Sequence, residues 1–296
     1  MKNVFLLVVF ILILCPLYAQ LEYNVTGTSK VYSWGPVYGE ESRTSSIMID
    51  LMFLKLLTFD ENQKVQPVVL AEAPERSKLV TGEGKLHLKL RNNVTWQSGK
   101  LVTADDVKFT WEVIKRSGVN NAMEKVSQIN NMIVYSDTEM DVIFEHDSDH
   151  NYGALTFYLL PKEKYLYDPE KADPYNIGPG HKFFTENPVT NGKFLPQKWR
   201  GIAPDGCCLE KNNAYYVRDV RDKLLNKFNF KWESGFTQIR TGVINGDFNI
   251  VMDVPVSEYS QFELISQKGE MVNKNLDSIL MLAFNLRKDV FKDHNL

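Results

Sequence analysis

The feature that most constrains the fold is the stretch 85–116, in which the hydrophobic period changes once. Leu86, Leu88 and Leu90 alternate with polar residues, which is typical of a strand with one buried face. After a turn and Thr103, apolar side chains recur at helical spacing to the end of the stretch. A half-buried strand followed by an amphipathic helix needs a core that both share. The sequence therefore predicts a globular fold that mixes strands and helices.

Two adjacent aspartates at the start of this helix allow two interpretations, a catalytic pair or a helix start. Thr103 and Asp106 match the Thr-x-x-Asp variant of the capping box. Both Asp105 and Asp106 also lie where negative charge favours the helix dipole. Neighbouring helical residues diverge by about 100°, so they cannot converge on a substrate. We therefore expect a helix cap, and we expect Trp111 with its apolar neighbours to lie in the core.

Composition and motifs argue against several functional classes. The chain has 296 residues and a formal charge of −3, which does not favour a nucleic-acid binder. No Gly-x-Ser-x-Gly elbow or phosphate loop is present, so we predict no catalytic residues, no cofactor and no enzyme. His146 and His150 have a spacing known from metal sites, but Asp147, Ser148 and Asp149 between them are loop formers. We predict a solvated turn there and no metal site.

The first 19 residues predict a secretory signal peptide. One lysine precedes an unbroken apolar run over 4–14, which is too short for a membrane span of about 20 residues. A lipid anchor at Cys15 is the alternative, but Leu14 stands where that processing favours a small side chain. We expect cleavage after Ala19 and a periplasmic or extracellular protein.

Two further cysteines, Cys207 and Cys208, are neighbours in a predicted strand. Neighbouring strand side chains point to opposite faces, so a disulfide between them would need strained geometry. We predict two small strand residues here.

The other elements are predicted from local patterns. A short strand is expected at 30–34, and a helix with Ser45 or Ser46 as its N-cap follows it. A stretch rich in Gly, Pro and Asn over 173–194 marks the best internal boundary. Beyond it we expect strands and helices in alternation, with one helix closed by Gly246. The predicted class is α/β, with a mixed α+β subdomain.

Taken in order, these segments resemble the family 5 extracellular solute-binding proteins of bacterial ABC importers, the oligopeptide-, dipeptide- and nickel-binding group. The most diagnostic stretch carries Leu90, Arg91, Trp96, Gly99, Thr103, Ala104, Asp106, Val107 and Phe109. Weaker similarity covers nearly all of the mature chain. Thr190, Asn191, Lys193 and Phe194 depart from the family pattern, and Val290 replaces its proline.

The resemblance implies a periplasmic-binding-protein type II-like clamshell. Residues 1–19 are the signal peptide, 20–46 begin the first lobe, 47–186 form an inserted subdomain, and 187–296 continue the first lobe. Family members continue into a second lobe, so we expect a chain truncated at its entry.

The resemblance also implies function and partners. We expect a monomer that binds a peptide or another small solute and delivers it to an ABC permease in the inner membrane. The alternatives are a truncated, non-transporting fragment, or an interaction or sensory module that retains the first lobe. The expected ligand-binding residues are Tyr32, Trp34, Tyr38 and Asn285, although the three aromatic residues could instead pack locally. The structural family motif comprises Trp96, Gly99, Thr103 and Asp106.

Overall fold

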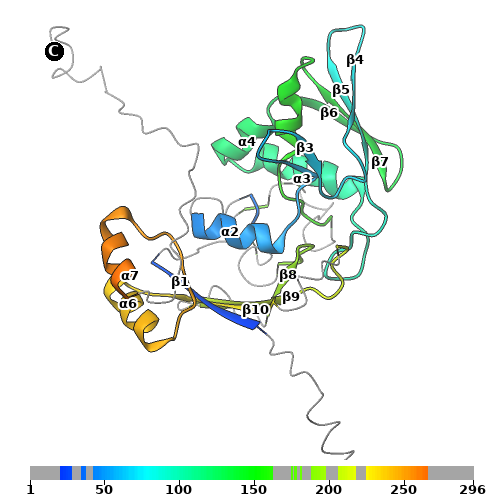
Figure 1. Ribbon diagram of the computed structural model, residues 1–296. Helices are drawn as coiled ribbons and strands as arrows, with labels where there is room; N and C mark the ends of the chain where they lie inside the picture. The colour runs from blue at the N-terminus through cyan, green and yellow to red at the C-terminus, as the bar shows by residue number, and fades with distance from the viewer. Residues whose placement is uncertain are drawn as a thin grey trace, which may run out of the picture.

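The computed structural model describes residues 21–28, 35–37, 43–162, 175, 177–178, 181, 188–197, 206–217 and 225–265. These residues form a five-stranded sheet, a four-stranded sheet and a two-stranded sheet. Figure 1 shows the two larger sheets in different parts of the molecule, with helix α2 between them. The predicted α/β class is therefore confirmed.

The five-stranded sheet combines the start of the chain with its second half. Its order is β11-β1-β10-β9-β8. Strand β1 is parallel to both β10 and β11, whereas β9 is antiparallel to β10 and to β8. The bounds are Leu21–Gly27 for β1, Phe194–Pro196 for β8, Gly206–Lys211 for β9, Leu225–Trp232 for β10 and Ile250–Val251 for β11. The predicted strand at 30–34 lies outside the described residues, and β1 was not predicted.

The four-stranded sheet is built from residues close in sequence, in the order β4-β5-β7-β6, and all its pairings are antiparallel. Its strands are β4 (Glu75–Lys78), β5 (Gly84–Lys89), β6 (Ile129–Val134) and β7 (Glu139–Phe144). The small sheet pairs β2 (Leu57–Phe59) with β3 (Val65–Pro67). Leu86, Leu88 and Leu90 are buried, as their alternation predicts.

The helices agree with most of the predicted segments. They are α2 (Arg43–Met52), α3 (Ala104–Arg116), α4 (Asn120–Val126), η1 (Asp149–Leu155), α6 (Phe236–Asn245), η3 (Val256–Glu258) and α7 (Tyr259–Ile265). Helix α4 was not predicted. Helix α2 begins at Arg43, so the prediction of Ser45 or Ser46 as its N-cap is wrong. Ser45 is instead buried within the helix.

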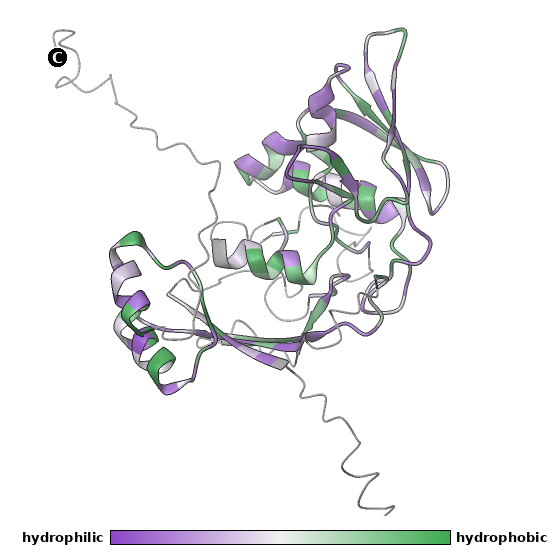
Figure 2. Cartoon of the chain, viewed as in Figure 1, coloured by the Kyte–Doolittle hydropathy of each residue, from purple (hydrophilic) through white to green (hydrophobic). Residues whose placement is uncertain are grey.

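One hydrophobic core connects the two larger sheets. It includes Val25 and Phe230 of the five-stranded sheet, Leu88 of the four-stranded sheet, and Met48 and Met52 of α2. Figure 2 shows hydrophobic residues along α2, between the sheets. No helix in the described ranges is both long and apolar enough to cross a membrane.

A short crossing segment, residues 191–192, joins the two parts of the fold at the end of α2. The N–H groups of Asn191 and Gly192 both donate to the carbonyl of Met52, at 3.2 and 2.8 Å. The Asn191 side chain accepts from the Leu54 N–H at 2.8 Å, and the Asn212 amide donates to the Gly192 carbonyl at 2.9 Å. A Cβ at Gly192 would lie 2.4 Å from the Met52 carbonyl carbon. This crossing therefore requires glycine at 192, and Asn191 caps the chain where α2 ends.

Candidate functional site

The topology singles out one edge of the five-stranded sheet. Gly27 at the end of β1 is directly opposite Trp232 at the end of β10, and Thr26 is opposite Val251 at the end of β11. The sheet order reverses at β1, because β10 lies on one side of it and β11 on the other. In open α/β sheets, ligands bind outside the carboxyl ends of the strands at such a switch point. This carboxyl edge is therefore the candidate site.

A carboxylate follows directly after β10. The Glu233 N–H donates to the Gly27 carbonyl at 3.1 Å, so β1 and β10 stay paired to their ends. The Glu233 side chain is 18% exposed and lies 2.8 Å from Lys231 Nζ. Trp232 is buried beside it, with its ring centroid 6.1 Å from that of Phe230. The edge thus carries a buried tryptophan and a charged pair next to each other in sequence.

The chain turns sharply after β11. The Met252 N–H donates to the Thr26 carbonyl at 2.9 Å, and Asp253 then adopts a positive φ of 55°. A non-glycine residue in this region costs about 1–2 kcal/mol, and Asp tolerates it better than most. Such backbone positions are found preferentially at functional sites. The turn places Met252 and Asp253 beside the end of β1.

Helix α6 begins at the same edge. Its N-cap is Gly235, which has extended backbone and contributes no side-chain cap to the first-turn N–H groups. The positive end of the helix dipole therefore lies just beyond Glu233. Gly246 ends the helix with a φ of 80°, as the sequence predicts. Together, the edge offers a carboxylate and a helix N-terminus, which can hydrogen-bond a polar ligand.

The expected ligand-binding residues are not among those that the structure describes. Tyr32, Trp34, Tyr38 and Asn285 all lie outside the described residues, as do residues 1–19 of the predicted signal peptide. Residues 35–37, between these aromatic residues, are described and buried. The four assignments therefore remain predictions.

The predicted capping box is present. Asp106 N–H donates to Thr103 Oγ1, and the Asp106 carboxylate accepts from the Thr103 N–H at 2.9 Å. The carboxylate also accepts from Trp96 Nε1 at 3.0 Å and from the Lys162 N–H at 2.7 Å. Gly99, in the turn after Trp96, has a φ of 83°. Asp106 thereby ties together the turn, the helix and the segment that follows η1.

The two aspartates differ in environment. Asp106 is buried, and burial raises the pKa of its carboxyl group despite the hydrogen bonds that act to lower it. Asp105 has a side chain that is 58% exposed and lies 3.6 Å from Lys162 Nζ. They do not face each other across a gap, so the geometry supports a helix cap rather than a catalytic pair.

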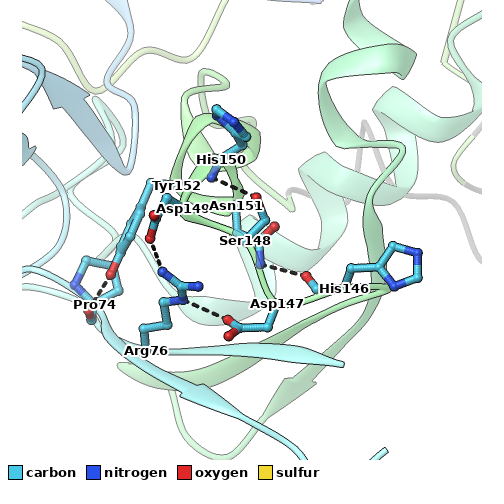
Figure 3. Close-up of polar contacts among 9 residues, drawn as sticks. All are labelled: Pro74, Arg76, His146, Asp147, Ser148, Asp149, His150, Asn151 and Tyr152. Atoms are coloured by element: carbon cyan, nitrogen blue, oxygen red, sulfur yellow. Dashed lines mark hydrogen bonds and ion pairs between the residues drawn. The ribbon is translucent and has the colours of Figure 1, made fainter. Parts of the chain in front are cut away.

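The histidine-containing segment 146–150 leads from β7 into η1, which begins at Asp149, and it is bound to β4. Figure 3 shows that His146 and His150 point in different directions. Arg76 Nε donates to Asp147 Oδ1 at 2.7 Å, and Arg76 also pairs with Asp149. This hydrogen bond from Arg76 lowers the pKa of Asp147. Across the described ranges, no three His, Cys, Asp or Glu side chains are grouped so as to hold a metal ion.

A second polar cluster lies on the outer face of the four-stranded sheet. The buried Asp141 accepts from His87 Nδ1 at 2.7 Å, Tyr135 Oη at 2.8 Å and Lys85 Nζ at 3.1 Å. His87 is on the polar face, as expected, but its side chain is only 27% exposed. Burial acts to raise the pKa of Asp141, but these hydrogen bonds outweigh it and the pKa lies below its ordinary value.

Cys207 and Cys208 both lie in β9, as predicted, and both are free thiols. Burial raises the pKa of the Cys207 thiol. A thiol with a raised pKa is a poor nucleophile at neutral pH. Cys207 packs against the hydrophobic core.

The carboxyl-edge residues were missed because none of them belongs to a motif. Glu233 follows the predicted strand 225–232, whereas Asp253 lies inside the predicted strand 248–255, because β11 ends already at Val251. The available signal was therefore only that each residue lies at the carboxyl end of a strand, because the ends of parallel strands meet at one edge of the sheet. Because β1 was not predicted, nothing indicated that these two residues lie at one edge.

Comparison with known proteins identifies the sequence family. The family described as "Bacterial extracellular solute-binding proteins, family 5 Middle" matches residues 68–296. No curated protein sequence matches the chain.

Solved structures agree with this match. The oligopeptide-binding protein AppA from Bacillus subtilis, in complex with a nonapeptide, is 20% identical with a TM-score of 0.67, over 83% of this chain and 46% of that one. NikZ from Campylobacter jejuni, in complex with Ni(L-His), is 21% identical with a TM-score of 0.65, over 83% and 45%. The periplasmic binding protein DppA from Helicobacter pylori, in complex with the peptide STSA, is 15% identical with a TM-score of 0.63, over 82% and 49%. The chain thus spans just under half the length of these proteins.

Proposed function

Because the chain belongs to family 5 of the bacterial extracellular solute-binding proteins, we propose that it binds a peptide or a similar small solute and delivers it to an ABC permease. Members of this family are extracytoplasmic binding proteins rather than enzymes, in agreement with the sequence analysis. The permease, a monomeric state and an exported form released by cleavage after Ala19 belong to the proposal. So does the choice of peptide, which rests on neighbours crystallised with peptides.

The observation that carries the proposal is the carboxyl edge of the five-stranded sheet. Glu233 and the N-terminus of α6 follow β10 at this edge, and Asp253 follows β11 on the other side of β1. A peptide presents amide donors and acceptors and a charged group at each end. The edge offers the complementary carboxylate and N–H groups.

The division of the chain into lobes is part of the proposal. The five-stranded sheet takes its strands only from 21–27 and from 194–251, whereas the four-stranded sheet lies within 75–144. This arrangement supports a first lobe formed by 20–46 and 187–296, with residues 47–186 inserted as a subdomain. In such a clamshell, the ligand contacts one lobe first and gains affinity when the second closes on it.

The direct test is calorimetric titration of the purified chain with a library of short peptides. We expect weak, saturable binding to the 296-residue chain. Glu233→Gln should weaken the binding about tenfold, which corresponds to about 1.4 kcal/mol, the loss of one charge-assisted hydrogen bond. Glu61→Gln is the matched control, because Glu61 is exposed in the turn between β2 and β3.

Three results would contradict the proposal in different ways. Saturable binding that Glu233→Gln leaves unchanged would move the ligand away from the carboxyl edge. A folded chain that binds no peptide in the library would favour the non-transporting fragment. Dimerisation in gel filtration, together with absent binding, would instead favour the interaction or sensory module.

A further inference from the structure

We draw no further inference here: the strongest candidate, a hollow of about 390 Å³ between α4 and η1 lined by Glu124, Lys125 and His150, is walled mostly by exposed side chains, and nothing in the structure shows what would occupy it.

Discussion

The two larger sheets differ in how the polar groups beside them are satisfied. In the part of the fold built around the four-stranded sheet, Asp106 and Asp141 are buried and accept hydrogen bonds from several neighbouring elements. At the carboxyl edge of the five-stranded sheet, Glu233 is bound on one side by Lys231, and α6 begins without a side-chain cap. In the first arrangement the polar groups are hydrogen-bonded within the protein. In the second, the first-turn N–H groups of α6 remain available to bind a ligand.

This difference explains why the most recognisable residues are not the proposed ligand contacts. Trp96, Gly99, Thr103 and Asp106 form a connected unit that fixes a turn to a helix. Trp96 and Asp106 are buried, so substitutions in this unit should disturb folding. Glu233, at the carboxyl edge, instead pairs with Lys231, whose side chain is largely exposed.

The largest expected effect is on the closed network around Asp106. Asp106→Ala leaves the donors of Trp96, Thr103 and Lys162 without their acceptor, and buried unpaired donors cost about 1–3 kcal/mol each. We expect the free energy of unfolding, measured with urea, to fall by about 3 kcal/mol. Asp105→Ala is the control, because this exposed neighbour should cost less than about 1 kcal/mol. Equal losses in the two variants would refute the buried network.

The crossing segment between the two sheets should be the next most sensitive. In Gly192→Ala the new Cβ would meet the backbone of Met52 at 2.4 Å, so the chain must shift. Overpacking of this kind costs about 1–3 kcal/mol, and we expect about 2 kcal/mol in urea unfolding. Gly153→Ala is the matched control, because nothing lies within 4 Å of its added Cβ. An unchanged stability of Gly192→Ala would show that the crossing is not tightly packed.

The Asp141 cluster should give a pH-dependent effect. Because the pKa of Asp141 is lowered in the folded protein, its contribution is present above the unfolded value of about 3.9 and is lost as the pH falls through the folded pKa. Asp141→Asn should therefore cost about 1–2 kcal/mol at pH 7, and this difference from the parent chain should shrink on acidification. Unfolding free energies measured in urea from neutral to acidic pH test this. Asp137→Asn, in the exposed turn before β7, is the matched control and should cost less than about 0.5 kcal/mol at pH 7.

The smallest effect is local and concerns strand β4. Arg76 holds this exposed edge strand to the turn at Asp147 and Asp149 (Figure 3). We expect Arg76→Ala to speed amide hydrogen exchange in β4 while global stability changes little, because exposed ion pairs contribute weakly. Lys78→Ala on the same strand is the control. Unchanged exchange in Arg76→Ala would show that pairing with β5 alone holds β4.

Local signals predicted much of the fold. Helix α3 was predicted over 104–116, which are the bounds that the structure gives. Its capping box and amphipathic stripe lie within a few residues of one another in the sequence, so no distant contact is needed to recognise them. The alternation in β5 and the glycine that ends α6 are local in the same sense.

Elements fixed by distant partners were harder to predict. Strand β1 pairs with β10 some 200 residues away, as in Leu21 opposite Leu225, and its polar Glu22 and Asn24 weaken the strand pattern. Asn191 departs from a family motif in the sequence. In the structure, its side chain accepts a hydrogen bond from the Leu54 N–H, 137 residues earlier in the chain. The pairing of β1 and the hydrogen bond of Asn191 both depend on tertiary contacts. The candidate site in turn depends on β1.

Amide hydrogen exchange with and without a bound peptide tests the central claim most directly. If the carboxyl edge of the five-stranded sheet is the ligand face, binding should slow exchange at 233–238 and 252–254, while 85–89 and 104–116 remain unchanged. Slowed exchange in β5 and α3, with none at the carboxyl edge, would contradict the account and would make the recognisable motif the ligand site.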